Sequence, residues 1–570
     1  MALVSPVRLA PKLSQPRASI TRVARAAWQP SSTWRVGNGW HWGWSGVVLG
    51  ALTLRRQVRR FASEKDLEAL IAECPWRRGL EPGEETEPTR LSFLGRLPAD
   101  LVGTIYRNGA GRIRVGKSMY KHWFDGDGFV TALTVDGQKQ EAAFTSRYVR
   151  TPRYAAQQKS EALYKTQAGE GMAMMGAWTP AANGKLLSNI FRLPTNPGNT
   201  SVIRWDDHLL ALCEGGLPFV IDPGSLETLG EELFTDASGV QMFSAHPKRD
   251  PDSGQLFNMG LKIGAQPALE VFKCSTDRRL LKSATISLEA LSFVHDFAIT
   301  EKYVVLIIPP WVASTNGLVQ SLYKGPLGQF FEWKEELGTR LLVLSKEDLS
   351  VALDKTLQPP MSFYHTVNAY DDDEKGMVRV QLAAHNGPRE AVEKNFSDMY
   401  RSTWSDKTYC SVRQLDLHLS TGHIDSSQLG PASASPFELP AIHPAFTGRK
   451  NRYAFTNAVY PPEAGFLNCV ERLDLEGTVV DRASFGPGQY AGEPMILPKT
   501  ADASDELAAY VCTYVYDSDT HTSFMAFLDA GDLAAGPVAE VQLPSHVPYS
   551  FHGEWVPGAV DVLERASVLP

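Results

Sequence analysis

The feature that most constrains the fold is a long succession of short apolar runs, each cut by turn residues. From Thr200 the chain reads SVIRW, DD, HLLALCE, GG, LPFVID and PGSLETLG, and similar pairs of runs continue toward the C-terminus. Runs at intervals of about 8 to 12 residues, separated by Gly, Pro and Asp, are typical of antiparallel strands. The pattern predicts an all-β fold, built as a sandwich, a barrel or a propeller, and no fixed-period repeat selects among them.

Composition narrows the classes of function. The net charge is −8 and no basic stripe is present, which argues against a nucleic-acid partner. The six cysteines are scattered without a C-x-x-C pair, so we expect buried thiols rather than a disulfide framework or a zinc site. The hydrophobic content of 43% is enough for a sizeable core.

Residues 1–63 differ from the rest of the chain. They carry ten Lys or Arg and no acidic residue, and they are dotted with Ser, Ala and Pro. This composition is typical of an organelle transit peptide, so we expect residues 1–63 to be cleaved. Within them, WHWGWSGVVLGALTL (residues 40–54) is shorter than the roughly 20 residues of a membrane span, although a retained anchor stays open. Residues 64–90 are expected to form an N-terminal helix and linker, and residues 91–570 the β domain.

Residues 119–138, MYKHWFDGDGFVTALTVDGQ, are predicted to form a hairpin with an aromatic strand, a D-G-D-G turn and an alternating strand. Asp125 and Asp127 have the side chains of metal ligands. Alternating Asp and Gly are also what tight turns with positive φ require, so we favour a turn at this position.

Four histidines stand out because each lies in a strand-like run rather than in polar surroundings. They are His246, His295, His365 and His552. A single histidine of this kind is more often a core residue with a hydrogen-bonded ring nitrogen. The intervals of about 50, 70 and 190 residues are too long for a helical motif such as H-E-x-x-H, so only the fold can bring them together.

Metal-bound histidines usually donate their second N–H to an acceptor, so a metal centre should include buried acids. In HLLALCE, strand alternation places Glu214 on the face of Leu210 and Leu212, where an unpaired carboxylate is costly. Glu438 in SPFELPAIH and Glu493 in YAGEPMILP are likewise flanked by apolar residues and proline. Three such acids beside four histidines suggest a metal centre without establishing one.

Eight motifs, in order, give the chain a resemblance to the carotenoid cleavage oxygenases, nearest to the apocarotenoid oxygenase branch. They are YRNG, HWFDGDG, AHPKRDPDSGQLF, FVHDFAIT, FYHTVNAYDDD, ELPAI, GEP and FHGEWVP. The resemblance runs from about residue 93 almost to the C-terminus. Two departures are Ala110, where the family often has proline after RNG, and TADASDELAAY (residues 500–510), which replaces an acidic-glycine motif.

The resemblance implies a seven-bladed β-propeller with a helical and loop cap over one Fe(2+) per chain. The iron would be bound by histidines from inner strands of different blades. The ligand positions fall on His246, His295, His365 and His552, and the outer acids on Glu214, Glu438 and Glu493. His295 is thus expected as a ligand, with Phe293 and Phe297 beside it on one strand face.

The implied activity is a non-haem dioxygenase reaction, in which O2 adds across one C=C bond of a carotenoid or apocarotenoid and gives two carbonyl products. No organic cofactor is required. Around the open iron position we expect Thr200, which matches a position that crowds the iron in some relatives. We also expect Phe293 and Tyr364 there, whose ring faces would stabilise a developing substrate cation. Simple core packing explains these two rings equally well.

A polyene substrate implies peripheral attachment to a membrane surface. The apolar stretches 171–191 and 307–333 are candidates for this contact, and buried crossovers are the alternative. The leader and the substrate class together predict the plastid, with the mitochondrion less favoured. A stilbene-cleaving oxygenase or a retinoid isomerase of the same family would keep the same ligands. A non-catalytic carotenoid-binding propeller is the alternative from a different class.

Overall fold

The computed structural model describes most of the chain from Glu73 onward. The described residues are 73–115, 118–120, 122–158, 173–175, 195–232, 234, 240–262, 266–317, 330–395, 408–431, 434–500 and 505–566. The expected transit segment 1–63, its apolar run 40–54, and nearly all of the expected helix that starts at Ser63 lie outside these residues, and so do most of residues 171–191.

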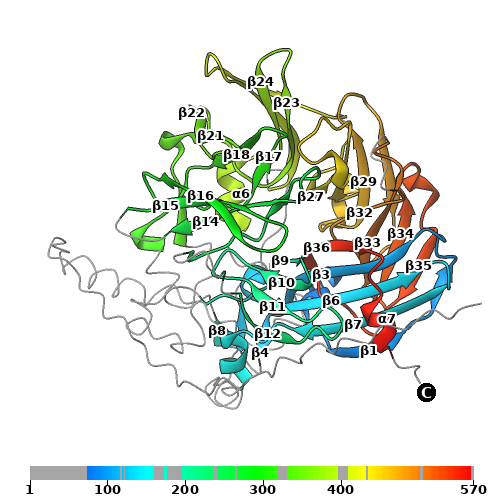
Figure 1. Ribbon diagram of the computed structural model, residues 1–570. Coiled ribbons are helices and arrows are strands. Elements are labelled where there is room, and N and C mark those ends of the chain that lie inside the picture. Colours follow the sequence, from blue (N-terminus) through cyan, green and yellow to red (C-terminus); the bar gives the residue numbers. More distant parts are fainter. Residues whose placement is uncertain are drawn as a thin grey trace, which may run out of the picture. The chain divides into compact units, whose positions relative to one another are not determined.

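The described chain is almost entirely β-structure, as predicted (Figure 1). One sheet has the order β1 (Thr86–Arg90), β7 (Glu141–Tyr148), β6 (Asp127–Asp136), β3 (Val102–Arg112) and β36 (Ser550–Pro557). A second sheet has the order β2 (Phe93–Gly95), β35 (Ala539–Gln542), β34 (Thr522–Asp529), β33 (Ala509–Asp517) and β31 (Gln489–Ala491), with β32 (Met495–Pro498) also paired to β33. Each of these two sheets therefore combines strands from near the start and near the end of the described chain.

Three four-stranded sheets and one eight-stranded sheet lie between these strands in sequence. The first is β12 (Thr228–Glu231), β11 (Phe219–Ile221), β10 (His208–Leu212) and β9 (Ser201–Trp205). The second is β13 (Lys248–Arg249), β14 (Leu256–Lys262), β15 (Ala268–Cys274) and β16 (Leu280–Ser287). The third is β17 (Phe297–Ile299), β18 (Tyr303–Ile308), β21 (Thr339–Ser345) and β22 (Val351–Leu357).

The eight-stranded sheet divides naturally into two groups of four. Its order is β23 (Phe363–Asp372), β24 (Met377–His385), β25 (Cys410–His418), β27 (Phe437–Ala441), β28 (Tyr453–Ala458), β29 (Cys469–Asp474) and β30 (Val480–Ser484), with β26 (Ile424–Gln428) also paired to β25. A single residue pair, Cys410 with Phe437, joins β25 to β27. The two groups are therefore nearly independent ladders.

Smaller elements complete the described structure. Two short sheets consist of β19 (Trp311–Ala313) with β20 (Phe331–Trp333), and of β4 (Arg114–Val115), β5 (Ser118–Tyr120) and β8 (Ala173–Met175). The helices and 3-10 turns include η2 (Pro75–Leu80), η3 (Trp123–Asp125), η5 (Glu335–Leu337), α6 (Pro388–Asn395), η6 (Pro444–Phe446), η7 (Pro462–Ala464), η8 (Leu533–Ala535) and α7 (Asp561–Arg565), and residues 152–158 are also helical. Among the helices in this part of the chain, none is both long and apolar enough to cross a membrane.

The core lies between neighbouring sheets. Seven clusters of buried side chains each draw on two of the larger sheets, or on the two halves of the eight-stranded sheet, and each of these sheets shares clusters with two neighbours. Examples are Tyr106 with Val202, Trp205 with Phe272, Met259 with Leu306, Val343 with Leu382, Val412 with Ala454, Phe455 with Val511, and Leu497 with Ile105. Apolar runs that alternate along a strand supply the two faces that this packing requires.

The hairpin expected over residues 119–138 is wrong. β6 pairs with β3 and β7, whereas β5 pairs with β4 and β8, so the two predicted arms belong to different sheets. The reason given for the glycines is also wrong, because Gly128 has no positive φ. A Cβ atom on Gly128 would instead lie 2.2 Å from the carbonyl oxygen of Gly198, so the close approach of two backbones excludes a side chain here.

Asp127 is not exposed in a turn. It is buried at the start of β6 and forms ion pairs of 3.0 Å with both Arg112 and Arg153. Asp125, its predicted companion, is buried in η3. The preference for a structural rather than a metal-binding role at this motif agrees with the ion pairs of Asp127.

In the described parts of 307–333, residues 307–312 are buried, whereas Thr315, Asn316 and Glu332 are exposed. Ile308, Trp311 and Val312 are at most 5% exposed, and β19 pairs with β20. Residues 318–329 lie outside the described part of the chain. The buried residues at the start of this stretch are what a crossover requires, and contact of the stretch with a membrane surface stays a prediction.

Candidate metal centre

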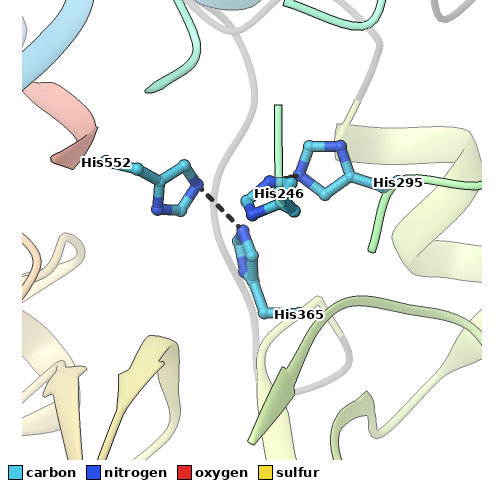
Figure 2. Close-up of side chains that lie close together, drawn as sticks. All are labelled: His246, His295, His365 and His552. Carbon is cyan, nitrogen blue, oxygen red and sulfur yellow. Dashed lines mark hydrogen bonds between the residues drawn. The ribbon is translucent and has the colours of Figure 1, made fainter. Parts of the chain in front are cut away.

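The fold brings together the four histidines singled out in the sequence, His246, His295, His365 and His552 (Figure 2). Each lies at the beginning of a strand or within two residues before one. The strands are β13, β17, β23 and β36, and each is the end strand of its own sheet. Four different sheets thus present one imidazole each to a common point.

The ring nitrogens have the spacing of ligands to one metal ion. Nε2 of His246 lies 2.9 Å from Nε2 of His295, and Nε2 of His365 lies 3.2 Å from Nε2 of His552. One ring nitrogen from each residue lies within 4.8 Å of those of the other three. Imidazole nitrogens bound at about 2.1 Å to one metal, at right angles to each other, are about 3 Å apart.

The three predicted glutamates contact the opposite nitrogen of three of these rings. Nδ1 of His365 donates to Oε2 of Glu438 at 2.7 Å, and Nδ1 of His552 donates to Oε1 of Glu493 at 2.6 Å. Nδ1 of His295 lies 2.5 Å from Oε1 of Glu214. A carboxylate at Nδ1 keeps the proton there and leaves the Nε2 lone pair free to bind a metal.

His246 is held differently. Among the described residues we find no carboxylate at its ring; its backbone N–H instead donates to Oγ of Ser244 at 3.2 Å. Ser244 Oγ in turn lies 3.4 Å from the carbonyl oxygen of His295. Burial lowers the pKa of His246 well below its ordinary value, and the three neighbouring imidazoles lower it further. The ring is therefore neutral, which is the form that binds metals.

The acids are held in the charged form. Burial alone would raise the pKa of Glu438, but the charge and hydrogen bond of His365 hold it at about 2. Burial opposes ionisation at Glu493 as well, and His552 with Arg107 lowers its pKa. The pKa of Glu214 is lowered in the same way by His295. Carboxylates in such a dry setting require compensating positive charge.

Sequence reasoning missed Arg107, which supplies part of that charge. Its side chain is 2% exposed, and Nη1 donates to Oε2 of Glu493 at 2.7 Å. Three carboxylates bring three negative charges, and Arg107 returns one positive charge. A divalent cation between four neutral imidazoles would balance the remaining two, so the residues present fit a divalent metal. The YRNG motif contains this arginine and was the available signal.

The three tentative residues all lie near the histidines. The carbonyl oxygen of Thr200 accepts the backbone N–H of His552 at 3.2 Å. The ring centroids of Phe293 and Tyr364 lie 5.8 and 5.9 Å from that of His295. Phe297 does not lie beside His295 as expected. β17 begins only at Phe297, which packs into the core between two sheets.

An aromatic group borders the His295 side of the centre. It consists of Trp311, Tyr364 and Val392, with Phe124, Phe293, Phe331 and Trp333 packed against them. Trp311 and Phe331 come from β19 and β20, and Val392 comes from α6. Apolar rings therefore pack beside His295, whereas carboxylates contact the outer nitrogens of three of the four rings.

Comparison with known proteins decides the family. The family model described as retinal pigment epithelial membrane protein matches residues 80–557 of this chain. The chain belongs to that family, the carotenoid oxygenases. Apocarotenoid-15,15'-oxygenase of Synechocystis is 29% identical over 84% of this chain and 96% of its own length. The probable carotenoid cleavage dioxygenase 4 of Arabidopsis thaliana, named chloroplastic, is 30% identical over 83% of this chain and 79% of its own.

Solved structures of the carotenoid oxygenase family give the same result. A mutant of the Synechocystis apocarotenoid oxygenase superposes with a TM-score of 0.74 at 27% identity and covers 85% of this chain and 98% of its own. A cobalt-substituted form of the same protein matches with a TM-score of 0.74 at 26% identity. The fold of the described residues is therefore the carotenoid oxygenase fold.

Proposed function

We propose that this chain is a non-haem Fe(2+) dioxygenase that cleaves one C=C bond of a carotenoid or apocarotenoid with O2. The observation that carries the proposal is the cluster of four imidazoles, three of them backed by buried carboxylates, in a member of the carotenoid oxygenase family. Relatives over most of its length are named as carotenoid cleavage dioxygenases.

The ligands in this proposal are His246, His295, His365 and His552, with Glu214, Glu438 and Glu493 outside them. Neutral imidazoles suit iron, and the two unbalanced negative charges of the centre suit a divalent ion. The match to a cobalt-substituted relative is compatible with a divalent metal at this point.

Bound ferrous iron would supply the activation of O2 and its addition to the double bond. Cleavage of C=C by O2 into two C=O groups balances atoms and electrons without another reductant or a proton donor. The protein's tasks are therefore orientation and exclusion of water. The glutamates keep Nδ1 protonated and the rings fixed, while Phe293 and Tyr364 present apolar faces beside His295.

The same proposal includes a seven-bladed β-propeller. If the eight-stranded sheet is divided at its single joining pair, seven ladders result, and each shares a cluster of buried side chains with the next. The last ladder packs on the first, and strands from both ends of the chain pair within the same sheets. α6 and the β19–β20 hairpin would form part of the cap over the iron.

A product assay tests the function. The chain is loaded with Fe(2+), incubated separately with apocarotenals, intact carotenoids, stilbenes and retinoids under ¹⁸O2, and the products are identified by mass spectrometry. We expect two carbonyl fragments, each carrying ¹⁸O. Geometric isomers without fragments would indicate a retinoid isomerase. Cleavage of stilbenes alone would indicate a stilbene-cleaving oxygenase. Tight binding without any conversion would leave a carotenoid-binding protein.

We propose that the protein works in the plastid, peripheral to membranes, because residues 1–63 have transit composition and several relatives are named chloroplastic. A fusion of residues 1–63 to a fluorescent protein should enter plastids and be shortened there. Import into mitochondria would contradict the proposal. Recovery of a full-length chain that resists carbonate extraction would mean that residues 40–54 are a retained anchor.

A further inference from the structure

Asp296, the residue after His295, is a buried carboxylate with contacts to three separate segments. Its side chain is 1% exposed, and Oδ1 lies 2.8 Å from Nζ of Lys248. Oδ2 accepts the backbone N–H of Thr366 at 2.7 Å and its hydroxyl at 2.8 Å. Oδ1 also accepts the N–H of Phe297 at 2.8 Å. Both oxygens of the Asp296 carboxylate thus accept from donors on β13, β17 or β23.

The partners of Asp296 are adjacent to histidines of the cluster. Lys248 follows His246 by two residues, and Thr366 follows His365 directly. β13, β17 and β23 belong to three different sheets, so within the described residues no ladder of backbone hydrogen bonds connects these ligand-bearing segments. Their spacing is therefore set by side-chain contacts, of which those of Asp296 are charged and link all three segments.

We propose that Asp296, Lys248 and Thr366, here called the Asp296 bracket, set the positions of three of the four imidazoles and thereby the metal affinity of the centre. The inference rests on the proposed metal site. Asp296 is a positioning residue, because it acts through the backbones of His246, His295 and His365. Charge-assisted hydrogen bonds are short and directional, so the bracket restricts how far these segments can separate.

The fourth histidine is outside the bracket. His552 is held by the pairing of β36 with β3 and by the hydrogen bond from its N–H to the carbonyl oxygen of Thr200. The bracket therefore explains how imidazoles from three unconnected sheets reach one point, while backbone pairing accounts for the fourth. Loss of the bracket should spread the three rings without unfolding β36.

The test is Asp296→Asn in the full chain, with Asp474→Asn as its matched control. Asp474 is also buried, forms a 2.7 Å ion pair with Arg452, and accepts the N–H of Glu476, but its partners are not near any of the four histidines in sequence. Both variants lose a buried charged acceptor. Thermal unfolding, Co(2+) affinity and the electronic spectrum of bound Co(2+) are measured for both and for the wild type.

We expect Asp296→Asn to bind Co(2+) roughly 10 to 100-fold more weakly, with an altered spectrum, whereas Asp474→Asn loses stability but keeps wild-type affinity. Equal affinity and spectrum in Asp296→Asn and the wild type would overturn the bracket alone. Failure of the wild type itself to bind Co(2+) would overturn the metal site and the bracket together. These two failures are distinguishable.

Lys248 offers a milder second variant if Asp296→Asn does not fold. Its side chain is 21% exposed, so Lys248→Met disturbs little packing; it leaves Asp296 without its cation and should lower stability, but the hydrogen bonds of Asp296 to Thr366 and Phe297 remain. We expect weaker Co(2+) binding in Lys248→Met and recovery of affinity in Lys248→Arg, which keeps the charge. Unchanged affinity in Lys248→Met would also overturn the proposal.

Discussion

At the scale of residues, the imidazoles and their acids were predictable from the sequence, but the reason they lie together was not. Buried histidines and glutamates are unusual enough to be noticed singly, and the family motifs identified the same seven positions. Arg107 was missed because its partner Glu493 is 386 residues away. Asp296 was missed for the same reason, because its partner Thr366 is 70 residues away. Long-range charge pairing leaves no signal in a short stretch of sequence.

The first prediction concerns His365. His365→Ala should remove one proposed ligand and abolish both metal binding and cleavage, since one of four ligands and the partner of Glu438 are lost together. His443→Ala is the control, because His443 is 2% exposed and caps η6 instead. Metal content and product formation are measured for both. Retention of bound metal in His365→Ala would contradict the ligand assignment.

A second prediction concerns the acid that Arg107 supports. Glu493→Gln should lower metal affinity or rate by about 10 to 100-fold, because the amide no longer holds the Nδ1 proton of His552 as strongly. Arg107→Met should destabilise the chain as well, by about 3 to 5 kcal/mol, because it leaves Glu493 buried without its cation. Metal titration and denaturant unfolding separate the two effects. Wild-type values in both variants would show that this pair is not coupled to the centre.

At the scale of elements, β36 shows how a strand positions a ligand. Gly553 follows His552 and pairs with Arg107 across the ladder with β3. A Cβ atom at Gly553 would lie 2.0 Å from the carbonyl oxygen of Tyr106, so the two backbones can pair only if residue 553 has no side chain. The FHGEWVP motif therefore carries its glycine for packing and its histidine for chemistry.

The third prediction follows from that contact. Gly553→Ala should force β36 away from β3, lower stability by about 1 to 3 kcal/mol and weaken metal binding through displacement of His552. At Gly531 the nearest atom, at 3.1 Å, is the end of the Asp529 side chain, so Gly531→Ala should change neither property. Thermal unfolding and metal titration measure both. A Gly553→Ala variant as stable as the wild type would contradict the crowding argument.

Element boundaries were the least predictable part. The run SFVHDFAIT was interpreted as one strand, but β17 covers only Phe297–Ile299, and Ser292 forms an isolated bridge with Val312. His295 lies between these two pairings, where the chain is free of a ladder and its ring can turn inward. Apolar alternation in the sequence does not reveal such an interruption, because it indicates which side chains are buried and not which backbone groups are paired.

At the scale of the whole molecule, the all-β class was predictable from the spacing of turns. The assembly of sheets was not, because their strands and connections differ in length and no constant repeat appears in the sequence. The sequence also did not predict that strands near the start of the described chain pair with strands near its end. β3 pairs with β36 and β2 with β35 across more than 400 residues, and no local pattern reports such a distance.

The fourth prediction tests that joining. A chain that ends at Tyr549 lacks β36 and exposes the edge of β3, so we expect loss of cooperative unfolding and aggregation. A chain that ends at Ala566 keeps β36 and α7, and it should unfold like the full-length protein. Differential scanning calorimetry and size-exclusion chromatography compare the two. Cooperative unfolding of the shorter chain would show that β36 is dispensable for the fold.

His552 lies in the last strand, and its partner strand β3 is among the first to be synthesised. All of the chain from β3 to β36 must therefore be synthesised before the fourth imidazole can meet the other three. Translation products that end before residue 552 have only three of the four proposed ligands. Under the proposed function, the complete ligand set would exist only after β36 has paired with β3, so the metal would be acquired late in folding rather than during synthesis.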